Sequence, residues 1–373
     1  MISSHMKQSG KIDIVLFVSV LMILVFGLIM LSSASAPVGL QRFQDQYFFI
    51  KRQLLFGVLP GMIFFLFLSK FSYTTLIKYA LPIFLGSLIL LLAVFIPGIG
   101  SSLNTGSHSW LVIGSYSFQP AEFAKLAMII FFASWLSKKA STMKDWKHGF
   151  LPAVFLGMIP IGLVILQPDV GTVSILFAIF FGLLFFANTK MTHMTFLAGL
   201  ALAGLAVMII AAPYRTERLM TFLRPELDPK GIGYQINQAF VAVGSGGLFG
   251  LGYNNSRQKF QYLPEVHADS IFAIIAEEMG FVISILYLVL LVYVAHRGLT
   301  LAKSVPDANA GFLVGGIIVW ILAQSFLNIG SIVGVLPLTG VPLPFVSHGG
   351  TALAITLAAM GIVMNVSRHA VRL

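Results

Sequence analysis

Long apolar stretches recur along this chain and are separated by short polar breaks. Ten of them approach the length of a membrane-spanning helix, which needs about 20 mostly apolar residues. We predict spans at Ile12–Ala34, Gln53–Leu68, Leu76–Ile96, Pro120–Leu136, Phe150–Leu166, Gly171–Ala187, His193–Ala211, Ile271–Ala295, Gly311–Val335 and Phe345–Val366. The pattern therefore predicts an all-α, polytopic integral membrane protein with about ten transmembrane helices.

One polar interruption, Ala212–Ser270, is much longer than the others. A loop of this length is usually functional or disordered, and its many aromatic residues argue against disorder. Within it, Tyr234–Val243 has the pattern of an amphipathic helix at the membrane surface. The glycine-rich piece Gly244–Gly252 follows no strand and precedes no GK[ST] motif. We therefore interpret it as a flexible re-entrant turn and not as a nucleotide site.

Two further polar loops differ in composition. The loop Pro97–Gln119 is rich in Gly and Ser and carries Trp110, a residue type common at the membrane interface. The loop Leu336–Val346 contains three prolines, which disfavour a helix and predict a stiff re-entry into the membrane.

Lys and Arg residues are unequally divided between the two sides of the membrane. With the N-terminus inside, the inner side holds Lys7, Lys11, Lys70, Lys78, Lys138, Lys139, Lys144, Lys147, Lys190, Arg297, Lys303, Arg368 and Arg372. The short outer loops hold only Arg42, Lys51 and Arg52. Because short loops rich in Lys and Arg stay in the cytoplasm, we predict that both termini are cytoplasmic. The loop 212–270 is then extracytoplasmic.

The composition also indicates a membrane protein, and it excludes several kinds of functional site. Of 373 residues, 58% are hydrophobic and 10% charged, and the mean hydropathy is +0.93. Soluble proteins are about 25% charged. The chain has no cysteine, which excludes disulfides, thiolate metal sites and a cysteine nucleophile. The net charge of +10 fits membrane topology and an anionic lipid substrate better than nucleic acid.

The N-terminal residues Met1–Met6, MISSHM, resemble a tag remnant and are set aside. We treat residues 7–373 as one membrane domain that includes the large outer loop 212–270. A cleavable signal peptide is not expected, because the first apolar run has full membrane length.

Ionisable residues are concentrated in Lys259–Gly280, which joins the long loop to the next span. Four of the 13 acidic residues of the chain lie there. Asp269 or Ser270 could simply cap the helix, since such residues are favoured at helix starts. Glu277 and Glu278 lie two turns inside the helix, where capping does not explain them. A functional role is therefore favoured for this segment.

A second ionisable pair, Glu122 and Lys125, lies just inside the fourth span. The i,i+3 spacing places both on one helix face, close enough to pair. Such a pair is either a structural clip or part of a path for substrate or ions, and both interpretations stay open. Asp169, which follows Gln167 and Pro168, is expected to cap the next helix.

The long loop combines basic and acidic residues next to the membrane. Arginines suit phosphate groups through bidentate hydrogen bonds, although attraction to lipid headgroups is the simpler alternative. The mixed charge favours a substrate with a lipid tail, a diphosphate and a sugar. In an extended chain, Glu265, His267 and Asp269 would point to one face, where carboxylates could hold Mg²⁺ or Mn²⁺. General-base chemistry by one carboxylate is the simplest mechanism that these residues offer.

Taken together, these stretches resemble the SEDS family (shape, elongation, division and sporulation) of FtsW/RodA peptidoglycan glycosyltransferases, over nearly the whole chain. The matching motifs are YSFQPAEFAKL from Tyr116, QPDVGT at Gln167–Thr172, RLMTFLRPELDPKGIGYQINQAFVAVGSGGLFGLG at Arg218–Gly252, KFQYLPEVHADSIFAIIAEEMGF at Lys259–Phe281 and LPLTGVPLPFVSHGG at Leu336–Gly350. Ten spans with both ends inside agree with this family. The pieces Gly233-Tyr234-Gln235 and Gln258-Lys259 look more like the division branch, FtsW.

The resemblance implies polymerisation of lipid II into glycan strands at the outer face of the bacterial cytoplasmic membrane. Asp269 stands where the family has its catalytic aspartate, and it would activate the acceptor hydroxyl. A divalent cation, Mg²⁺ or Mn²⁺, would bind at Asp269 and Glu265. The family's cavity pair is matched by Glu122 and Lys125.

The resemblance also guides the expected substrate contacts and partners. We expect Arg218 and Lys259 to contact the diphosphate, and Glu265 and His267 to contact the substrate. The implied partners are the undecaprenyl-diphosphate-linked glycan and a class B penicillin-binding transpeptidase, with no nucleic acid. Two other functions stay open: a lipid II flippase or transporter, and a scaffold for division or elongation without chemistry.

Three short motifs depart from the family pattern. Ser107, His108 and Ser109 precede Trp110 where the family has two arginines. The usual HTDF is HADS, ending at Ser270, and the usual SYGG is SHGG, with His348 as its second residue. Because Asp269 is kept, these departures are expected to affect substrate contacts and affinity and to leave the catalytic residue in place.

Overall fold

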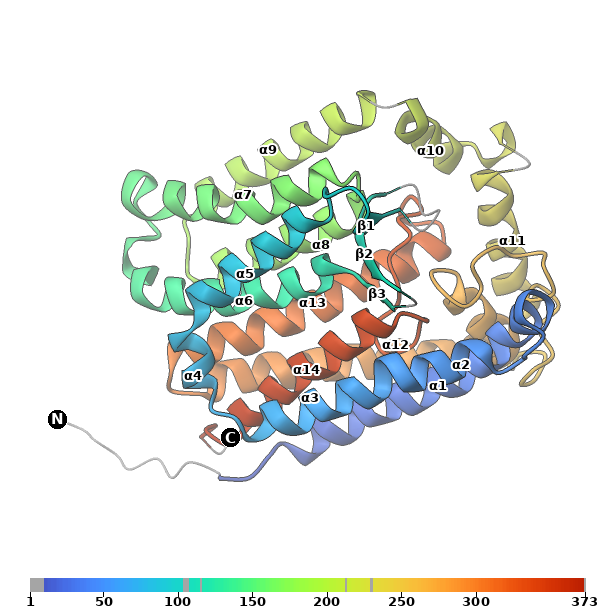
Figure 1. The fold of residues 1–373 in the computed structure, drawn as a ribbon, viewed down its shortest axis with the longest axis horizontal. Coiled ribbons are helices and arrows are strands. Elements are labelled where there is room, and N and C mark those ends of the chain that lie inside the picture. Colours follow the sequence, from blue (N-terminus) through green and yellow to red (C-terminus); the bar gives the residue numbers. More distant parts are fainter. Residues whose placement is uncertain (1–9, 103–106, 115, 212, 229–230, 372–373) are drawn as a thin grey trace.

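The computed structural model describes residues 10–102, 107–114, 116–211, 213–228 and 231–371, so the expected tag remnant Met1–Met6 lies outside the described residues. Most of the described chain is helical (Figure 1). The helices are α1 (Ile14–Phe43), α2 (Phe48–Gln53), α3 (Leu59–Lys70), α4 (Tyr73–Lys78), α5 (Ala80–Ala93), α6 (Pro120–Lys139), α7 (Leu151–Leu166), α8 (Val170–Phe186), α9 (Met191–Ile210), α10 (Pro213–Leu223), α11 (Ile232–Ser245), α12 (Ile271–Ser304), α13 (Ala308–Ile332) and α14 (Gly350–Ser367). The strands are β1 (Gly100–Ser101), β2 (Trp110–Ile113) and β3 (Tyr116–Phe118).

The apolar runs become helices that confirm the all-α polytopic fold. In the described chain, 8 helical segments are long and apolar enough to cross a membrane, and the shorter apolar helices α5 and α8 complete the predicted spans. One long segment, Phe48–Lys70, joins α2 and α3 through a π-helical turn at Leu54–Val58. The amphipathic pattern of Tyr234–Val243 is likewise confirmed as the helix α11.

Several predicted boundaries are wrong. α1 continues past Ala34 to Phe43, and two further differences have identifiable reasons. α12 continues past Ala295 to Ser304, because polar residues at its inner end extend the helix beyond the apolar run. α14 begins at Gly350 and not at Phe345. Pro342 and Pro344 precede it, and Phe345 has a positive φ of 65°, so this stretch leaves helical geometry. Residues 341–349 therefore form a non-helical segment inside the molecule.

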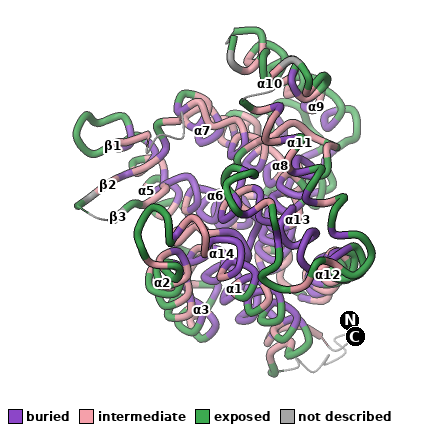
Figure 2. Tube along the Cα trace, turned by 90° about the vertical axis from the view of Figure 1, so that its right-hand side faces the viewer, coloured by how far each residue is buried: buried purple, intermediate pink, exposed green. Residues whose placement is uncertain are grey.

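The centre of the bundle is formed by α6, α13 and α14. Within their most apolar windows, 78%, 67% and 78% of the residues are buried, compared with 17% in α9. Figure 2 shows the same contrast, with buried segments in the middle and exposed segments around them. An ionisable side chain in the buried part of these helices is therefore removed from water and requires a partner.

The loop Pro97–Gln119 contains a small antiparallel sheet that the apolar runs did not predict. β2 is the middle strand: Leu111 pairs with Gly100 of β1 and with Phe118 of β3. The last strand leads within two residues into α6. The sheet therefore lies at the end of the bundle where α6 begins (Figure 1).

The glycine-rich piece Gly244–Gly252 packs into a break in α12. The break lies at Gly280, whose φ is 75°, and an added Cβ there would lie 2.2 Å from the amide of Gly250. Four backbone hydrogen bonds cross the break: Phe281 N to Gly247 O (2.9 Å), Val282 N to Leu248 O (3.1 Å), Leu251 N to Glu277 O (3.0 Å) and Gly252 N to Glu278 O (3.0 Å). These bonds satisfy the groups that the broken helix leaves free. The expected flexible turn is therefore wrong, and the piece is a bonded part of the fold.

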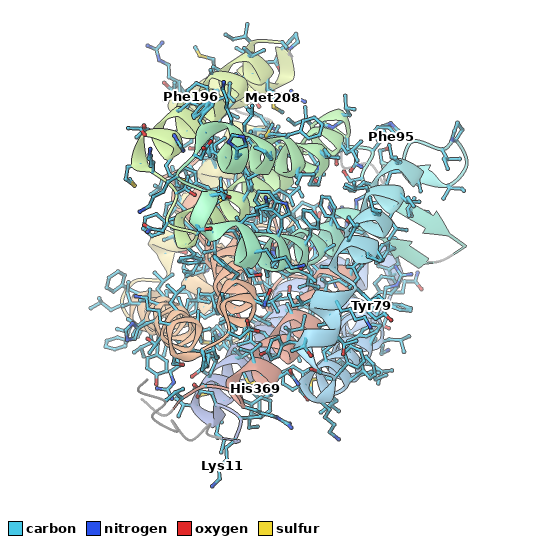
Figure 3. All side chains as sticks on the ribbon, turned by 90° about the vertical axis from the view of Figure 1, so that its left-hand side faces the viewer. Lys11, Tyr79, Phe95, Phe196, Met208 and His369 are labelled. Carbon is cyan, nitrogen blue, oxygen red and sulfur yellow. The ribbon has the colours of Figure 1, made fainter. Side chains whose placement is uncertain are left out.

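The two ends of the described chain meet at one end of the bundle. The amide of Gly10 donates to the carbonyl of Arg368 at 3.0 Å, and the guanidinium of Arg297 on α12 pairs with Asp13 at 2.8 Å. Figure 3 looks at this end and labels Lys11 and His369. Ends on one side agree with an even number of spans. The assignment of that side to the cytoplasm stays a prediction from the Lys and Arg distribution.

Candidate active site

The segment 261–270, which carries most of the predicted site, folds as consecutive turns before α12. Gln261 and Glu265 have positive φ values of 71° and 51°. The extended strand expected for Glu265, His267 and Asp269 is therefore wrong, and alternation does not place these side chains on one face. Ser270 is the N-cap residue of α12, and its side chain makes no capping hydrogen bond. Neither Asp269 nor Ser270 is explained by helix capping.

The backbone around Asp269 is held by three hydrogen bonds from outside the segment. The bonds run from His348 N to His267 O (2.8 Å), from Ser347 Oγ to Ala268 O (2.5 Å) and from Asn328 Nδ2 to Asp269 O (2.8 Å). Three consecutive carbonyl groups therefore accept hydrogen bonds from α13 and from the segment before α14. These bonds fix the backbone from which the Asp269 side chain projects.

The segment 341–349, which contains the donors Ser347 and His348, is itself held by Gln53, a buried residue at the end of α2. Its amide nitrogen donates to the carbonyl of Ser347 at 3.1 Å, and its amide oxygen accepts from the amide of Gly349 at 2.9 Å. On the other side, Gln235 of α11 donates to the hydroxyl of Ser270 at 3.0 Å. Segments far apart in sequence thus converge on the residues that flank Asp269.

The Asp269 residue is half-buried, and its surroundings make the carboxyl a weaker acid than usual. Loss of solvation raises its pKa to about 6, and the nearby negative charge of Glu265 acts in the same direction. Hydrogen bonds from its own amide and from Ser270 oppose this shift, and so does the positive charge of Arg218. A carboxylate with a pKa near the working pH is suited to take a proton.

Two histidines lie beside Asp269 and contact the same aromatic ring. Phe49 of α2 has its ring centroid 4.1 Å from that of His267 and 5.2 Å from that of His348. Burial lowers the pKa of His267 to about 4 and that of His348 to about 3. Both imidazoles are therefore neutral at neutral pH and form a polar but uncharged wall of the site.

Glu122 and Lys125 pair as predicted, and they do so at the buried centre of the bundle. The Nζ of Lys125 is 2.8 Å from Oε1 of Glu122, and both side chains are buried. The ammonium also donates to Oε1 of Gln324 at 2.8 Å and lies 4.9 Å from the centroid of the Trp320 ring. Oε2 of Glu122 is buried and has no hydrogen-bond partner among the described residues.

One face of α13 joins this pair to the backbone of Asp269. Trp320, Gln324 and Asn328 follow one another at four-residue intervals, which places them on one side of the helix. Gln324 donates to the carbonyl of Pro342 at 2.9 Å, and Asn328 donates to that of Val341 at 2.8 Å. The predicted intramembrane pair and the predicted catalytic residue therefore belong to one connected network.

Lys259 lies elsewhere, in a buried cluster with Glu278. Its ammonium donates to Glu278 (2.9 Å), to Ser33 of α1 (2.9 Å) and to Asn254 (2.6 Å). Glu277 accepts from the hydroxyl of Ser256 and from backbone amides of the same loop. The acids inside α12 thus hold the loop 254–259 in place. The Lys259 charge is already neutralised here, and its contact with a diphosphate stays a prediction.

The remaining predicted residues are at the surface. Arg218 is exposed on α10, and its charge reaches the Asp269 carboxyl. The Glu265 side chain is exposed, with one oxygen 3.9 Å from Nε2 of His267. The described residues contain no group of three His, Cys, Asp or Glu side chains placed to hold a metal ion. The predicted cation site therefore consists of two carboxylates, those of Glu265 and Asp269. Mg²⁺ commonly binds one or two carboxylates together with waters and substrate phosphates.

Sequence reasoning missed the residues that support the site. Gln53, Gln324, Asn328 and Ser347 all bind backbone or buried polar groups close to it. The i,i+4 spacing of Gln324 and Asn328 within an apolar span was a detectable signal, since buried amides require partners. Gln53 at the edge of a span gave no such signal.

Comparisons with known proteins agree with this architecture. A family model described as "Cell cycle protein", for FtsW, RodA and SpoVE, matches residues 14–372. The "Stage V sporulation protein E" of Bacillus subtilis (strain 168) is 41% identical over 357 residues, which cover 96% of this chain and 97% of that protein. A Geobacter sp. (strain M18) protein named "Probable peptidoglycan glycosyltransferase FtsW" is 34% identical over 362 residues, covering 97% and 98% of the two chains.

Solved structures share the fold. A chain from a structure described as "Structural coordination of polymerization and crosslinking by a peptidoglycan synthase complex" matches with a TM-score of 0.79 and 29% identity, over 96% of this chain and 98% of that one. The rod shape determining protein RodA of Thermus thermophilus matches with a TM-score of 0.71 and 26% identity, over 97% and 98%. The likeness therefore extends over the whole membrane domain.

Proposed function

Because the chain belongs to the cell cycle protein family of FtsW, RodA and SpoVE, we propose that it is a peptidoglycan glycosyltransferase that polymerises lipid II. It acts as a multi-pass protein of the bacterial cytoplasmic membrane, at the outer face. The observation that carries the proposal is the half-buried residue Asp269, which is backbone-anchored and whose carboxyl is shifted to a pKa of about 6.

In the proposed reaction, Asp269 is the general base. Its carboxylate takes the proton from the 4-hydroxyl of the acceptor GlcNAc, and that oxygen attacks the anomeric carbon of the donor MurNAc with inversion. A new glycosidic bond forms as the bond to the undecaprenyl diphosphate breaks, and the diphosphate leaves with the electron pair. The raised pKa lets the carboxyl hold the proton after attack.

Charge on the leaving diphosphate needs compensation, and we assign this role to Arg218 on α10. Its guanidinium is exposed on the side of Asp269 and suits bidentate contact with phosphate oxygens. We propose that Glu265 and Asp269 hold a divalent cation, Mg²⁺ or Mn²⁺, which when bound would add positive charge near the diphosphate. The neutral imidazole of His267 can meet sugar hydroxyls without adding charge.

The proposed partner is a class B penicillin-binding transpeptidase, which would cross-link the strands that this chain makes. The proposal rests on the likeness to a chain of a peptidoglycan synthase complex that combines polymerization and crosslinking. The two activities then share one assembly at the outer face of the membrane.

A lipid II flippase is the second candidate function, favoured by one observation. Glu122 has a buried oxygen without a partner among the described residues, at the centre of the bundle next to Lys125. Intramembrane ionisable groups often mark transport paths. A flippase would translocate labelled lipid II in vesicles and would do so equally well without the Asp269 carboxylate.

The experiment is polymerisation of purified lipid II by the full chain with its transpeptidase partner. We expect glycan strands from the wild type and at least a roughly 100-fold loss in Asp269→Asn, which keeps the shape but cannot take the proton. Asp45→Asn, which changes a half-exposed carboxylate between α1 and α2, is the matched control and should retain the rate. Loss of activity in EDTA, with recovery on added Mg²⁺, would support the cation. Normal strands from Asp269→Asn would refute the mechanism.

A further inference from the structure

Helix α13 places two buried amide side chains beside the segment that supports Asp269. The helix packs against α6, α8 and α12 in the middle of the bundle (Figure 1). Gln324 and Asn328 are each 1% exposed, and their spacing of four residues puts both on one side of the helix. A buried amide is destabilising unless its hydrogen bonds are made, so the partners of these two side chains show what they hold.

The donors around Gln324 fix the direction in which its amide points. Lys125 and Trp320 can only donate, and both donate to its Oε1 at 2.8 Å. The NH₂ group of Gln324 therefore has to face the other way, where it donates to the carbonyl of Pro342 at 2.9 Å. A rotated amide would place its N–H groups against an ammonium and an indole N–H. The bond to Pro342 is therefore the one arrangement that these neighbours allow.

Asn328, one turn further along α13, uses its NH₂ group twice. It donates to the carbonyl of Val341 at 2.8 Å and to that of Asp269 at 2.8 Å, so both of its N–H donors are used. Val341 and Pro342 are consecutive, which means that α13 binds two successive carbonyls of the segment 341–349. One side chain, that of Asn328, therefore joins the central helix, this segment and the residue proposed as the base.

The rest of the Asn328 side chain makes no comparable contact. Its Oδ1 is buried and has no hydrogen-bond partner among the described residues, which is destabilising by itself. A side chain that served only packing would be apolar and would avoid this penalty. The requirement for an amide here therefore comes from the two carbonyls, and one of them belongs to Asp269.

We propose that Asn328 and Gln324 are positioning residues of the polymerisation reaction. Asn328 holds the backbone of Asp269 on the centre of the bundle, and Gln324 keeps the adjoining segment 341–349 from shifting. The inference rests on the proposed function, because it concerns the position of the proposed base. A displacement of about 1 Å in a reacting group can lower a rate by about 100-fold, so loss of the Asn328 bond should be visible in the rate.

A second buried asparagine supplies a matched control. Asn365 on α14 is 4% exposed and also joins two backbone groups: its Nδ2 donates to the carbonyl of Ser69 at 3.1 Å, and its Oδ1 accepts from the amide of Tyr73 at 3.2 Å. The Tyr73 ring packs on His369, at the end of the bundle where the chain termini meet (Figure 3). Asn365→Ala should therefore lower stability as Asn328→Ala does, without touching the neighbourhood of Asp269.

The test compares these variants in the full chain with its transpeptidase partner. Asn328→Ala should lower kcat for lipid II polymerisation by about 100-fold and change KM by no more than about twofold, because the groups that bind substrate stay in place. Gln324→Met should lower kcat by about tenfold, since Asn328 still holds Asp269. Asn365→Ala should keep kcat within about twofold of wild type at a similar shift in thermal unfolding. Equal kcat values for Asn328→Ala and Asn365→Ala would overturn the inference.

Hydrogen exchange provides a readout that does not depend on activity. The amides of Ala268 and Ser270 donate to the carbonyl of Glu265 at 2.9 and 3.2 Å, so their exchange reports whether these turns stay formed. Asn328→Ala should speed exchange in the peptide 263–270 by about tenfold or more, whereas Asn365→Ala should leave it unchanged. Exchange at the wild-type rate in Asn328→Ala would show that the bond does not hold this segment.

The outcome is separable from that of the proposed function. If wild type polymerises lipid II, Asp269→Asn does not, and Asn328→Ala keeps the wild-type kcat, the positioning role is refuted and the proposed function stands. If Asp269→Asn polymerises normally, both are refuted. Should Asn328→Ala fail to fold, Asn328→Ser takes its place. Its single O–H can serve only one of the two carbonyls, so kcat should again fall and KM should again stay unchanged.

Discussion

This molecule contains two buried Lys–Glu pairs, which differ in how completely their hydrogen-bonding groups are satisfied. Lys125 and Glu122 meet at 2.8 Å in the centre of the bundle, and Lys259 and Glu278 meet at 2.9 Å beneath the outer loop. All four side chains are almost completely removed from solvent. Distance and burial alone would assign both pairs the same role.

The second pair is complete. Lys259 has three acceptors, which is the full number of its N–H donors. Both oxygens of Glu278 accept from Ser33, at 2.7 and 2.8 Å. A buried ion pair whose bonds are all used fixes the chain in one arrangement and offers nothing to a ligand.

The first pair is incomplete. Lys125 has two acceptors and directs its remaining face toward the Trp320 ring, and Glu122 has an oxygen without a partner among the described residues. Gln324 connects this pair to the segment that supports Asp269. We infer that an incomplete buried pair marks a working part of the molecule, whereas the complete pair is a structural support.

Removal of the Lys259 charge should have the largest effect on stability. Lys259→Met leaves Glu278 buried without its cation, which costs about 3–5 kcal/mol for pairs of this kind. Thermal or denaturant unfolding in a fixed detergent measures the change. A loss no greater than about 1 kcal/mol would show that water reaches the cluster and that the pair is not a buried support.

Replacing each of the two glutamates with the isosteric glutamine should distinguish the two pairs by their effect on stability. In Glu278→Gln, a neutral acceptor replaces the charged one that accepts from Lys259, Ser33 and the amide of Ser256, so three hydrogen bonds are weakened. Glu122→Gln can direct its NH₂ to the oxygen position that has no partner. We expect Glu278→Gln to be the more destabilising by about 1.5–3 kcal/mol. The reverse order, measured by the same unfolding assay, would contradict the distinction between the two pairs.

Removal of the charge from an exposed ion pair should have the smallest effect on stability. Lys51 and Asp45 meet at 2.7 Å, but their side chains are 66% and 33% exposed. Lys51→Met should change stability by only about 0–1 kcal/mol, because water already solvates both charges. A loss comparable to that of Lys259→Met would mean that burial does not decide the strength of these pairs.

The sequence predicted the spans well, because apolar length is read directly from residue types. It also predicted that Glu122 and Lys125 pair, since an i,i+3 spacing within a helix leaves little freedom. The capping role of Asp169 followed in the same way, and its side chain accepts from the amide of Thr172 at 2.9 Å. These are local features that neighbouring residues determine.

Features that depend on distant segments were not predictable. Ser347 and Asn328 hold backbone carbonyls around Asp269, and any residue type provides such a carbonyl, so no pattern marks it. Gly280 breaks α12 at the place where Gly244–Gly252, distant in sequence, packs against the helix. The support role of Glu277 likewise appeared only when the loop that it binds was placed beside it.

The central claim is that Asp269 accepts a proton during strand growth, and the pH dependence of polymerisation tests it most directly. The base must be deprotonated, and burial raises its pKa to about 6. The rate should therefore rise about tenfold per pH unit below this value and level off above it. A wild-type rate that stays constant through about pH 6, or that falls as the pH rises, would contradict the account.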